Sequence, residues 1–329
     1  MRRTSRIIGR VALLSLSVVA VLWAALALHF APLVAPPWGD ALAALMLLGT
    51  VVVLARLRLV QAGLVALLAP ALVFVAFLQL HPTNDGAWEP EYAVLATAAR
   101  DGNIVRISNI RNFAWTAATT ATPRYYDATF TLSDVQGVDL VMSYWAGDAI
   151  AHVFVSFAFA GGRHLAISAE TRRAAGQDYS TLGGFFRNYE LFYVVADERD
   201  VIGVRANMRG ERIYLYRLQA SPDAARLLLL SYLEKVNALA KTPEFYNTVA
   251  DNCTSNVIGR IAAMAGGAGR PSYSWKLLLS GYTDSYAYDL GRLNTRLPFP
   301  ELKLRSRLGD GADTSTASDY SSAIRAGLP

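Results

Sequence analysis

The chain has 329 residues, a formal net charge of +5 and a hydrophobic fraction of 53%. The charge is modest and is due in part to arginines beside apolar segments, so we expect no nucleic acid among the partners. With one cysteine and four histidines, the chain cannot form an internal disulfide and lacks the Cys and His pairs of common zinc sites. It also lacks glycine-rich phosphate-binding motifs, and we expect no metal and no other cofactor.

Three apolar segments occupy the first 80 residues, namely 11–30, 41–54 and 63–80. Each is near the roughly 20 residues that a helix needs to cross a bilayer, although the second and third are somewhat short. Four arginines precede the first segment, Arg56 and Arg58 separate the second from the third, and the loop 31–40 has no Lys or Arg. The positive-inside rule therefore predicts a cytoplasmic N-terminus and an exported remainder. A cleaved signal peptide is the alternative for the first segment, but its apolar core is too long for one.

We divide the chain into a three-span anchor, residues 1–80, and an exported domain, residues 81–329, which is long enough to build its own core. Apolar alternation and β-branched residues predict strands at 103–110, 126–132, 138–144, 151–159, 164–171, 191–196 and 212–218. The turn signal Gly161-Gly162 separates two of these strands, which predicts a hairpin.

Residues 221–241 predict a helix that begins at the N-cap Ser221, and a second helix follows near the cysteine. Strands that precede helices predict an α+β fold. The compositionally biased segments 114–122 and 309–322 predict loops. The run Asp-Glu-Arg-Asp at 197–200 is expected to form a turn whose charges pair with one another.

Cys253 lies directly before an apolar-periodic stretch that predicts a helix, with Asp251 or Asn252 as its N-cap. Free N–H groups and the positive end of the helix dipole stabilise a thiolate at this point, which lowers the pKa of the thiol. A lone cysteine in an exported domain is either an inert core thiol or a nucleophile. We take Cys253 as the candidate nucleophile.

A cysteine nucleophile needs a base within hydrogen-bond reach and usually a third group that orients the base. The exported domain holds two histidines well inside it, His152 and His164. His152 projects from a predicted strand on the face it shares with Ser156, whereas His164 follows a turn. We therefore predict His152 as the base; a structural strand histidine is the alternative.

The third group is expected on the neighbouring strand of the hairpin. With a three-residue loop at 161–163, His152 lies opposite Arg172, and Glu170 and Ser168 project within diagonal reach. A two-residue loop would bring Thr171 there instead. We predict Glu170 as the third catalytic residue and keep Ser168 and Thr171 as alternatives. The backbone N–H of Cys253 and a second donor would form the oxyanion hole.

Five runs of the exported domain resemble a known family: WAGDAIAH at 145–152, VSFAF at 155–159, ISAETRR at 167–173, YVVADERD at 193–200 and YNTVADNCT at 246–254. They are similar to the Lnb-type periplasmic domain family, named after a bacterial enzyme that N-acylates lipoproteins. The resemblance implies a circularly permuted papain-like (NlpC-type) fold, in which the histidine strand precedes the cysteine helix. It implies Cys253 as nucleophile and His152 as base, and less directly Glu170 as the third member. It further implies a bacterial inner membrane, with the domain in the periplasm.

These observations predict a membrane-anchored cysteine acyltransferase whose substrates are a phospholipid or a lipoprotein. The aromatic-rich stretches 185–193 and 273–288 would then line a lipid groove, or else form ordinary core. A cysteine peptidase or amidase of the cell envelope is the first alternative, since the same three residues serve a water acceptor. A non-enzymatic, membrane-tethered binding module is the second alternative. Shared fold and site residues do not by themselves establish a shared substrate.

Overall fold

The computed structural model describes residues 2–249, 252–264, 274–277, 279–309 and 319–329. The chain divides into two compact units. The first, here called the anchor unit, comprises Met1–Thr83, Asp178–Glu190 and Phe245–Thr248. The second, here called the sheet unit, comprises Asn84–Gln177, Leu191–Glu244 and Val249–Pro329. Two short segments from the later part of the chain thus belong to the unit that holds the apolar helices.

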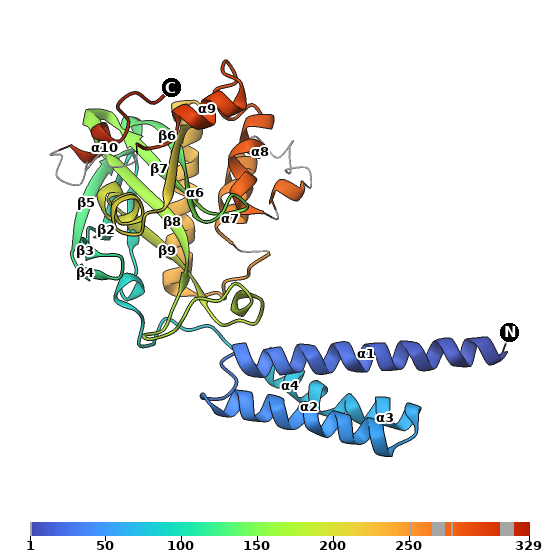
Figure 1. Cartoon of the computed structure of the whole chain (residues 1–329). Helices are drawn as coiled ribbons and strands as arrows, with labels where there is room; N and C mark the ends of the chain where they lie inside the picture. Colours follow the sequence, from blue (N-terminus) through green and yellow to red (C-terminus); the bar gives the residue numbers. More distant parts are fainter. Residues whose placement is uncertain (1, 250–251, 265–273, 278, 310–318) are drawn as a thin grey trace. The chain divides into compact units, whose positions relative to one another are not determined.

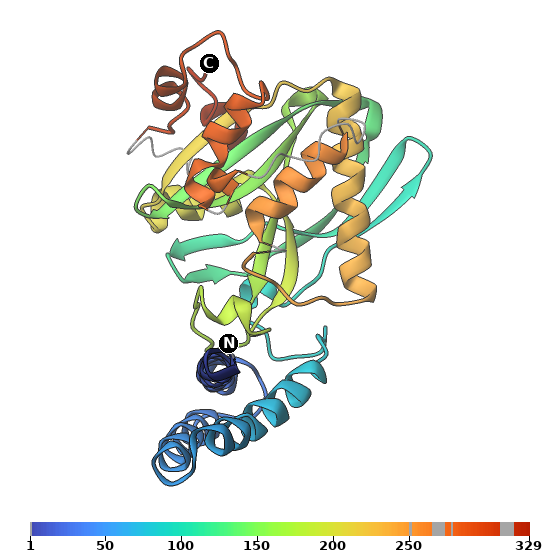
Figure 2. The same cartoon turned by 90° about the vertical axis from the view of Figure 1, so that its right-hand side faces the viewer.

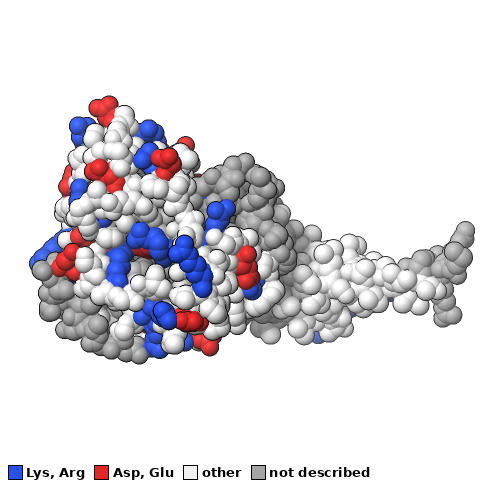
Figure 3. Space-filling view, turned by 90° about the horizontal axis from the view of Figure 1, so that it is seen from above, with Lys and Arg blue, Asp and Glu red and all other residues white. Residues whose placement is uncertain are grey.

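The anchor unit contains α1 (Arg2–Phe30), α2 (Trp38–Arg56), α3 (Leu59–Ala66) and α4 (Leu68–Leu78). Three stretches are long and apolar enough to cross a membrane: Ile7–Phe30, Trp38–Arg56 and Leu59–Leu78. The part of the anchor unit that Figure 3 draws in white shows almost no Lys, Arg, Asp or Glu side chains on the face that is seen. The prediction of three N-terminal helices of membrane-spanning length is therefore confirmed.

The third apolar stretch is interrupted at Leu67, between α3 and α4. Pro70 lacks the N–H that would bond to the carbonyl four residues earlier, which weakens the helical ladder at this point. Helix α1 packs closely on α3 at Gly63, whose carbonyl accepts the hydroxyl of Ser17 over 3.0 Å. A Cβ at Gly63 would lie 2.9 Å from Leu13 Cγ. The absence of a side chain allows this close approach of two apolar helices.

An eight-stranded sheet, counted over the described residues, forms the centre of the sheet unit (Figure 1). Its strands are β1 (Thr97–Asp101), β2 (Ile104–Arg111), β5 (Tyr125–Thr131), β6 (Val135–Ala146), β7 (Ile150–Phe159), β8 (His164–Arg172), β9 (Glu190–Ala196) and β10 (Arg212–Arg217). Their order is β1-β2-β9-β8-β7-β6-β10, with β5 paired to β2. The seven predicted strands are all present, and β1 is an additional one.

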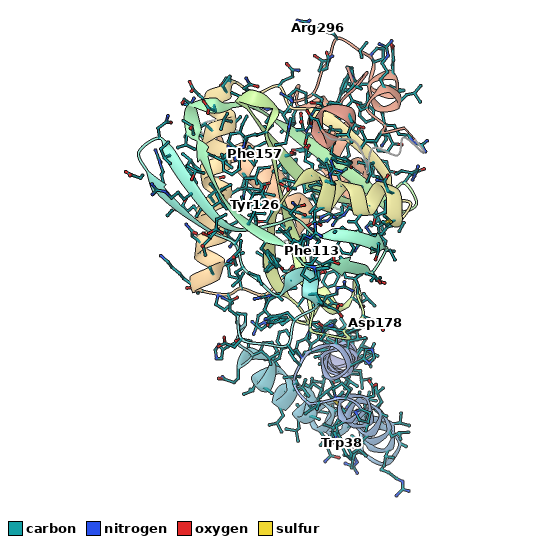
Figure 4. The ribbon with its side chains drawn as sticks, turned by 90° about the vertical axis from the view of Figure 1, so that its left-hand side faces the viewer. Trp38, Phe113, Tyr126, Phe157, Asp178 and Arg296 are labelled. Atoms are coloured by element: carbon teal, nitrogen blue, oxygen red, sulfur yellow. The ribbon has the colours of Figure 1, made fainter. Side chains whose placement is uncertain are left out.

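Successive side chains of β7 point to opposite faces of the sheet, and both faces are buried there. On one face Phe154 packs with Ile202 of α5 (Glu198–Gly203) and Tyr320 of α10 (Tyr320–Ala323). On the other face Phe157, labelled in Figure 4, contacts Tyr232 of α6 (Pro222–Lys241) with 6.0 Å between ring centroids. Figure 2 shows α6 and α7 (Cys253–Met264) side by side across the sheet. The predicted α+β fold is confirmed.

The predicted long helix is also confirmed, since the hydroxyl of Ser221 accepts the N–H of Ala224 and so caps α6. The remaining helices are α8 (Thr283–Asp289), α9 (Phe299–Arg305), a π-helix (Val204–Met208) and the short 3-10 helices Pro90–Tyr92, Leu132–Asp134, Ala160–Gly162, Gly183–Phe185, Trp275–Leu277 and Ser280–Tyr282.

The prediction of a loop at 114–122 is wrong. The segment forms a separate two-stranded sheet, β3 (Ala114–Ala117) and β4 (Thr120–Thr122). Trp115 fixes it, because its indole N–H donates to Asp200 over 2.8 Å. For the second predicted loop, at 309–322, residues 310–318 lie outside the described residues and Tyr320 begins α10.

The prediction that the charges of 197–200 pair with one another is also wrong. Asp200 is fully buried and forms two bonds with Arg111, of 2.8 and 3.0 Å. Glu198 is buried as well and binds Arg325 over 2.6 and 2.8 Å. A buried carboxylate needs a charged partner, and here the sheet brings in partners that are distant in sequence.

Candidate active site

The first turn of α7 is fixed by a reciprocal cap. The side-chain oxygen of Asn252 accepts the N–H of Ser255 over 2.7 Å, and the Ser255 hydroxyl accepts the N–H of Asn252 over 2.9 Å. Asn252 is thus the N-cap and Cys253 the first helical residue, which confirms one of the two predicted caps. The other, Asp251, lies outside the described residues. Cys253 is half-buried.

The sulfur of Cys253 lies where strands β7 and β8 part. The last residues that pair between these two strands are Val155 and Ile167, although β7 begins earlier, at Ile150, and β8 continues to Arg172. The N–H of Phe159 bonds across the hairpin, so the odd-numbered residues of β7 direct their N–H groups toward β8. Val153, beyond the last pair, donates its N–H to the sulfur of Cys253 instead. This bond favours the thiolate over the thiol.

The imidazole of His152 is held by two oxygens of β8. Its Nε2 lies 2.7 Å from the hydroxyl of Ser168 and 3.0 Å from Oε1 of Glu170. Ser168 in turn donates its hydroxyl to the same Oε1 over 2.7 Å. The ring also forms a hydrogen bond with Cys253. Because Nε2 is engaged by the oxygens, Nδ1 is the ring nitrogen that faces the sulfur.

The hairpin register differs from the predicted one. The loop has three residues, but they are Ala160–Gly162 rather than 161–163, and Gly161 and Gly162 both have a φ of +76°. Continuing the register of the ladder sets His152 directly opposite Glu170, so the predicted pairing with Arg172 is wrong. Of the two alternatives for the third group, Ser168 lies in the cluster. Thr171 points to the other face of the strand.

Arg205 completes the cluster and was missed by the sequence analysis. It lies on the π-helix Val204–Met208, and its Nη2 donates to Oε1 of Glu170 over 2.9 Å. Its side chain is 8% exposed, lies over the ring of Phe154 at 5.4 Å and donates a second bond to the carbonyl of Val201. No motif in the sequence links this arginine to a glutamate 35 positions earlier.

The charges of the cluster shift three pKa values. Burial by itself lowers the pKa of His152, but the Glu170 carboxylate and the bond to Cys253 outweigh it and raise the pKa to about 9. Burial raises the pKa of Cys253, whereas His152 and the N–H of Val153 bring it below 9.0 in net. Glu170 stays ionised, because His152 and Arg205 hold its pKa well below 4.5 despite burial. The two shifts, downward for Cys253 and upward for His152, act in favour of a thiolate–imidazolium pair.

The second histidine of the domain lies apart from this cluster. His164 bonds through Nδ1 to the carbonyl of Gly162 at the hairpin turn. Ser156 does lie on the predicted face with His152, but its hydroxyl donates to Glu198 over 2.5 Å. The candidate site therefore consists of Cys253, His152 and three supporting side chains, Glu170, Ser168 and Arg205.

This arrangement is chemically suited to attack on a carbonyl group. In such a reaction the thiolate would be the nucleophile, the imidazolium would return a proton to the leaving group, and Glu170 would orient the ring. As the first helical residue, Cys253 has an N–H without an intrahelical acceptor, which is placed to stabilise an oxyanion. Among the described residues, no three His, Cys, Asp or Glu side chains gather in a metal-binding arrangement.

Residues 121–281 match the family model of the Lnb N-terminal periplasmic domain. The matched range contains β7, β8, the π-helix Val204–Met208 and α7, and therefore every residue of the candidate site. Searches of curated proteins and of solved structures found no match for this chain.

Proposed function

We propose that this chain, whose residues 121–281 belong to the Lnb N-terminal periplasmic domain family, is a membrane-anchored thiol acyltransferase. The chain is membrane-anchored and carries a periplasmic domain. We place the anchor in the bacterial inner membrane with a cytoplasmic N-terminus, because the arginines in the first turns of α1 and those at the junction of α2 and α3 obey the positive-inside rule. The permuted papain-like architecture remains a prediction, which the order of histidine strand and cysteine helix favours.

The proposed reaction has two steps. In the first, the Cys253 thiolate attacks the carbonyl carbon of an acyl ester in a phospholipid or lipoprotein. The carbon–oxygen bond breaks, the leaving alcohol takes the proton of the His152 imidazolium, and a thioester forms. In the second, an amine such as the N-terminus of a lipoprotein attacks the thioester carbonyl. Its proton passes to His152, the amide is released and the thiolate–imidazolium pair returns.

One observation carries this proposal, namely that three kinds of anion-stabilising group meet at the sulfur of Cys253. A helix N-terminus, the N–H of Val153 and the imidazolium of His152 all stabilise the anion. A structural thiol in a core needs none of them. The anchor supports a lipid substrate, because it keeps the nucleophile near the bilayer and so raises the effective concentration of acyl esters.

The test uses the full-length protein in phospholipid nanodiscs and intact-mass spectrometry. We expect an acyl-mass adduct on the wild type and none on Cys253→Ala. Addition of a lipoprotein-like peptide with a free N-terminal amine should then discharge the adduct to an N-acyl peptide. His152→Ala should retain its fold and lose turnover, with His164→Ala as the matched control.

The two alternative functions predict different results in the same experiment. A peptidase or amidase would label with peptide-like electrophiles and never with lipid. A binding module would leave Cys253 unreactive toward alkylating agents and replaceable by Ala without loss of activity. Either result would end the acyltransferase proposal.

A further inference from the structure

Residues 178–190 form a compact loop that belongs to the anchor unit although they come from the middle of the chain. The phenol oxygen of Tyr189 accepts the N–H of Ser180 and donates to the carbonyl of Asp178, which closes the loop. Inside it lies the turn Gly183–Phe185. We call residues 178–190 the membrane-contact loop, because their partners lie on the membrane helices of the anchor unit.

One side of this loop packs on the first membrane helix. Phe186 is buried together with Ala27 and Ala31. Its ring stacks on Phe30 with 5.8 Å between centroids and lies 6.3 Å from the ring of Trp23. Trp23 precedes Phe30 by seven residues, so it lies about 10 Å along the helix from its end. The loop thus reaches alongside the apolar span and does not stop at its terminus.

The same loop is fastened to the last membrane helix by Arg187. Its guanidinium donates to the carbonyls of Phe77 and Leu80, the first near the end of α4 and the second just after it, over 2.9 and 3.3 Å. It also lies over the rings of Phe77 and Phe245, at 4.7 and 5.5 Å. Arg187 adopts a φ of +54°, a left-handed conformation that costs energy for a residue with a side chain. The strained backbone at Arg187 thus coincides with the contact between the loop and the end of α4.

The outer side of the loop is apolar and exposed. Tyr179, Leu182 and Phe185 are 44%, 55% and 44% exposed. Exposure of three neighbouring apolar side chains to water is unfavourable. The headgroup region of a bilayer, by contrast, favours aromatic and aliphatic side chains, with an Arg at the same depth. The adjacent Phe186 already contacts a helix that is apolar enough to span the membrane.

We propose that the membrane-contact loop inserts Leu182 and Phe185 into the periplasm-facing leaflet of the bilayer. The choice of leaflet follows from α4, because its C-terminal end leads into the periplasmic domain and its carbonyl at Phe77 accepts a hydrogen bond from Arg187. The occupant of the exposed apolar surface is therefore lipid, at the boundary of headgroups and acyl chains.

The inserted loop is also bonded to the segment that leads toward the candidate nucleophile. The N–H of Thr248 donates to the carbonyl of Gly184, and its hydroxyl donates to the carbonyl of Thr181. A Cβ on Gly184 would collide with that hydroxyl. Thr248 precedes Cys253 by only five residues. If the proposed acyltransferase function holds, the inserted loop limits how far the nucleophile can lie from the bilayer, because so few residues separate Thr248 from Cys253; insertion itself does not depend on that function.

Insertion is tested by depth-dependent quenching. Because Cys253 is the only cysteine, full-length Cys253→Ala accepts a single new thiol at Leu182→Cys or Phe185→Cys for labelling with an environment-sensitive fluorophore. In nanodiscs with spin-labelled phospholipids, both positions should be quenched. Leu72→Cys, 72% exposed on α4, is the membrane control, and Leu304→Cys, 74% exposed on α9 of the sheet unit, is the aqueous control. Quenching at 182 and 185 no greater than at 304 would overturn the proposal.

A second experiment separates this inference from the proposed function. Leu182→Asp and Phe185→Asp, made in the wild-type background, should reduce formation of the lipid adduct on Cys253. Alkylation of Cys253 by soluble iodoacetamide should remain unchanged in both variants. If the wild type forms no lipid adduct, the acyltransferase proposal fails, while quenching still decides insertion. Unchanged adduct formation in both Asp variants would refute a role of the loop in lipid delivery.

Discussion

Arg205 donates to Oε1 of Glu170 over 2.9 Å, and the same oxygen lies 3.0 Å from Nε2 of His152. One carboxylate oxygen is thus shared by a permanent cation and an imidazole. The arginine holds Glu170 ionised and in place, and the ionised Glu170 raises the pKa of His152. Arg205 is therefore a positioning residue that acts on the sulfur through two others.

Replacing Arg205 with Met should destabilise the fold and disturb the site. Glu170 is buried and would keep the imidazolium of His152 but lose the guanidinium of Arg205, so the cost should stay below the about 3–5 kcal/mol of a fully broken buried pair. Arg305→Met, which breaks the exposed pair with Glu301, should cost less than about 1 kcal/mol. Thermal unfolding measures both. Rescue by Arg205→Lys in the pH profile of Cys253 alkylation would identify the positioning role, and an unchanged profile in Arg205→Met would contradict it.

The reactivity of Cys253 should persist below the range of an ordinary thiol. Its pKa is lowered by His152, whose own pKa of about 9 keeps the imidazolium present through neutral pH. In His152→Ala, burial remains and the cation is lost, so the pKa of the thiol should rise. Alkylation by iodoacetamide at pH 7 should slow by about tenfold for each unit of that rise. Rates from pH 5 to 10 measure it. His164→Ala should match the wild type, and an equal slowing there would reject the assignment.

The third member of the site can be identified by three substitutions. Glu170→Gln removes the charge that raises the pKa of His152, so that pKa should fall from about 9 toward or below 6.5. Ser168→Ala leaves Glu170 at 3.0 Å from Nε2 and should therefore change the pKa of His152 less. Thr171→Val should have no effect. Titration of the imidazole by NMR measures all three. A larger change in Ser168→Ala than in Glu170→Gln would make the serine the orienting group.

The buried carboxylate of Glu198 should make stability depend on Arg325 and on pH. The pKa of Glu198 is lowered in the fold, mainly by Arg325 acting against burial. Its contribution is therefore present above about pH 4.5 and is lost as the pH falls through the lowered value. Arg325→Met should cost about 3–5 kcal/mol at pH 7. The difference from wild type should shrink in acid, because Glu198 in the variant can be protonated. A constant difference from pH 7 to 3 would be inconsistent with this account.

Much of the fold was predictable because it depends on local patterns. Apolar length gave the membrane helices, alternation gave the strands, and Ser221 and Asn252 were recognisable caps. For the aromatic stretches, the sequence pattern did not distinguish buried core residues from exposed residues that could contact lipid. Tyr193 is buried in the sheet unit, whereas Phe185 is exposed in the anchor unit. Both are aromatic residues of the same stretch, and their burial differs because of how the tertiary structure packs them.

By itself, the sequence determined that a lone cysteine begins a helix and that a histidine lies on an earlier strand, since caps and alternation act over a few residues. Only the tertiary structure decided which groups surround them. A shift of the hairpin loop by one residue set Glu170, and not Arg172, opposite His152, and the parting of two strands freed the N–H of Val153. Arg205 and the partners of the buried acids come from distant segments. Burial requires each of these charges to be paired, but no local pattern specifies the partner.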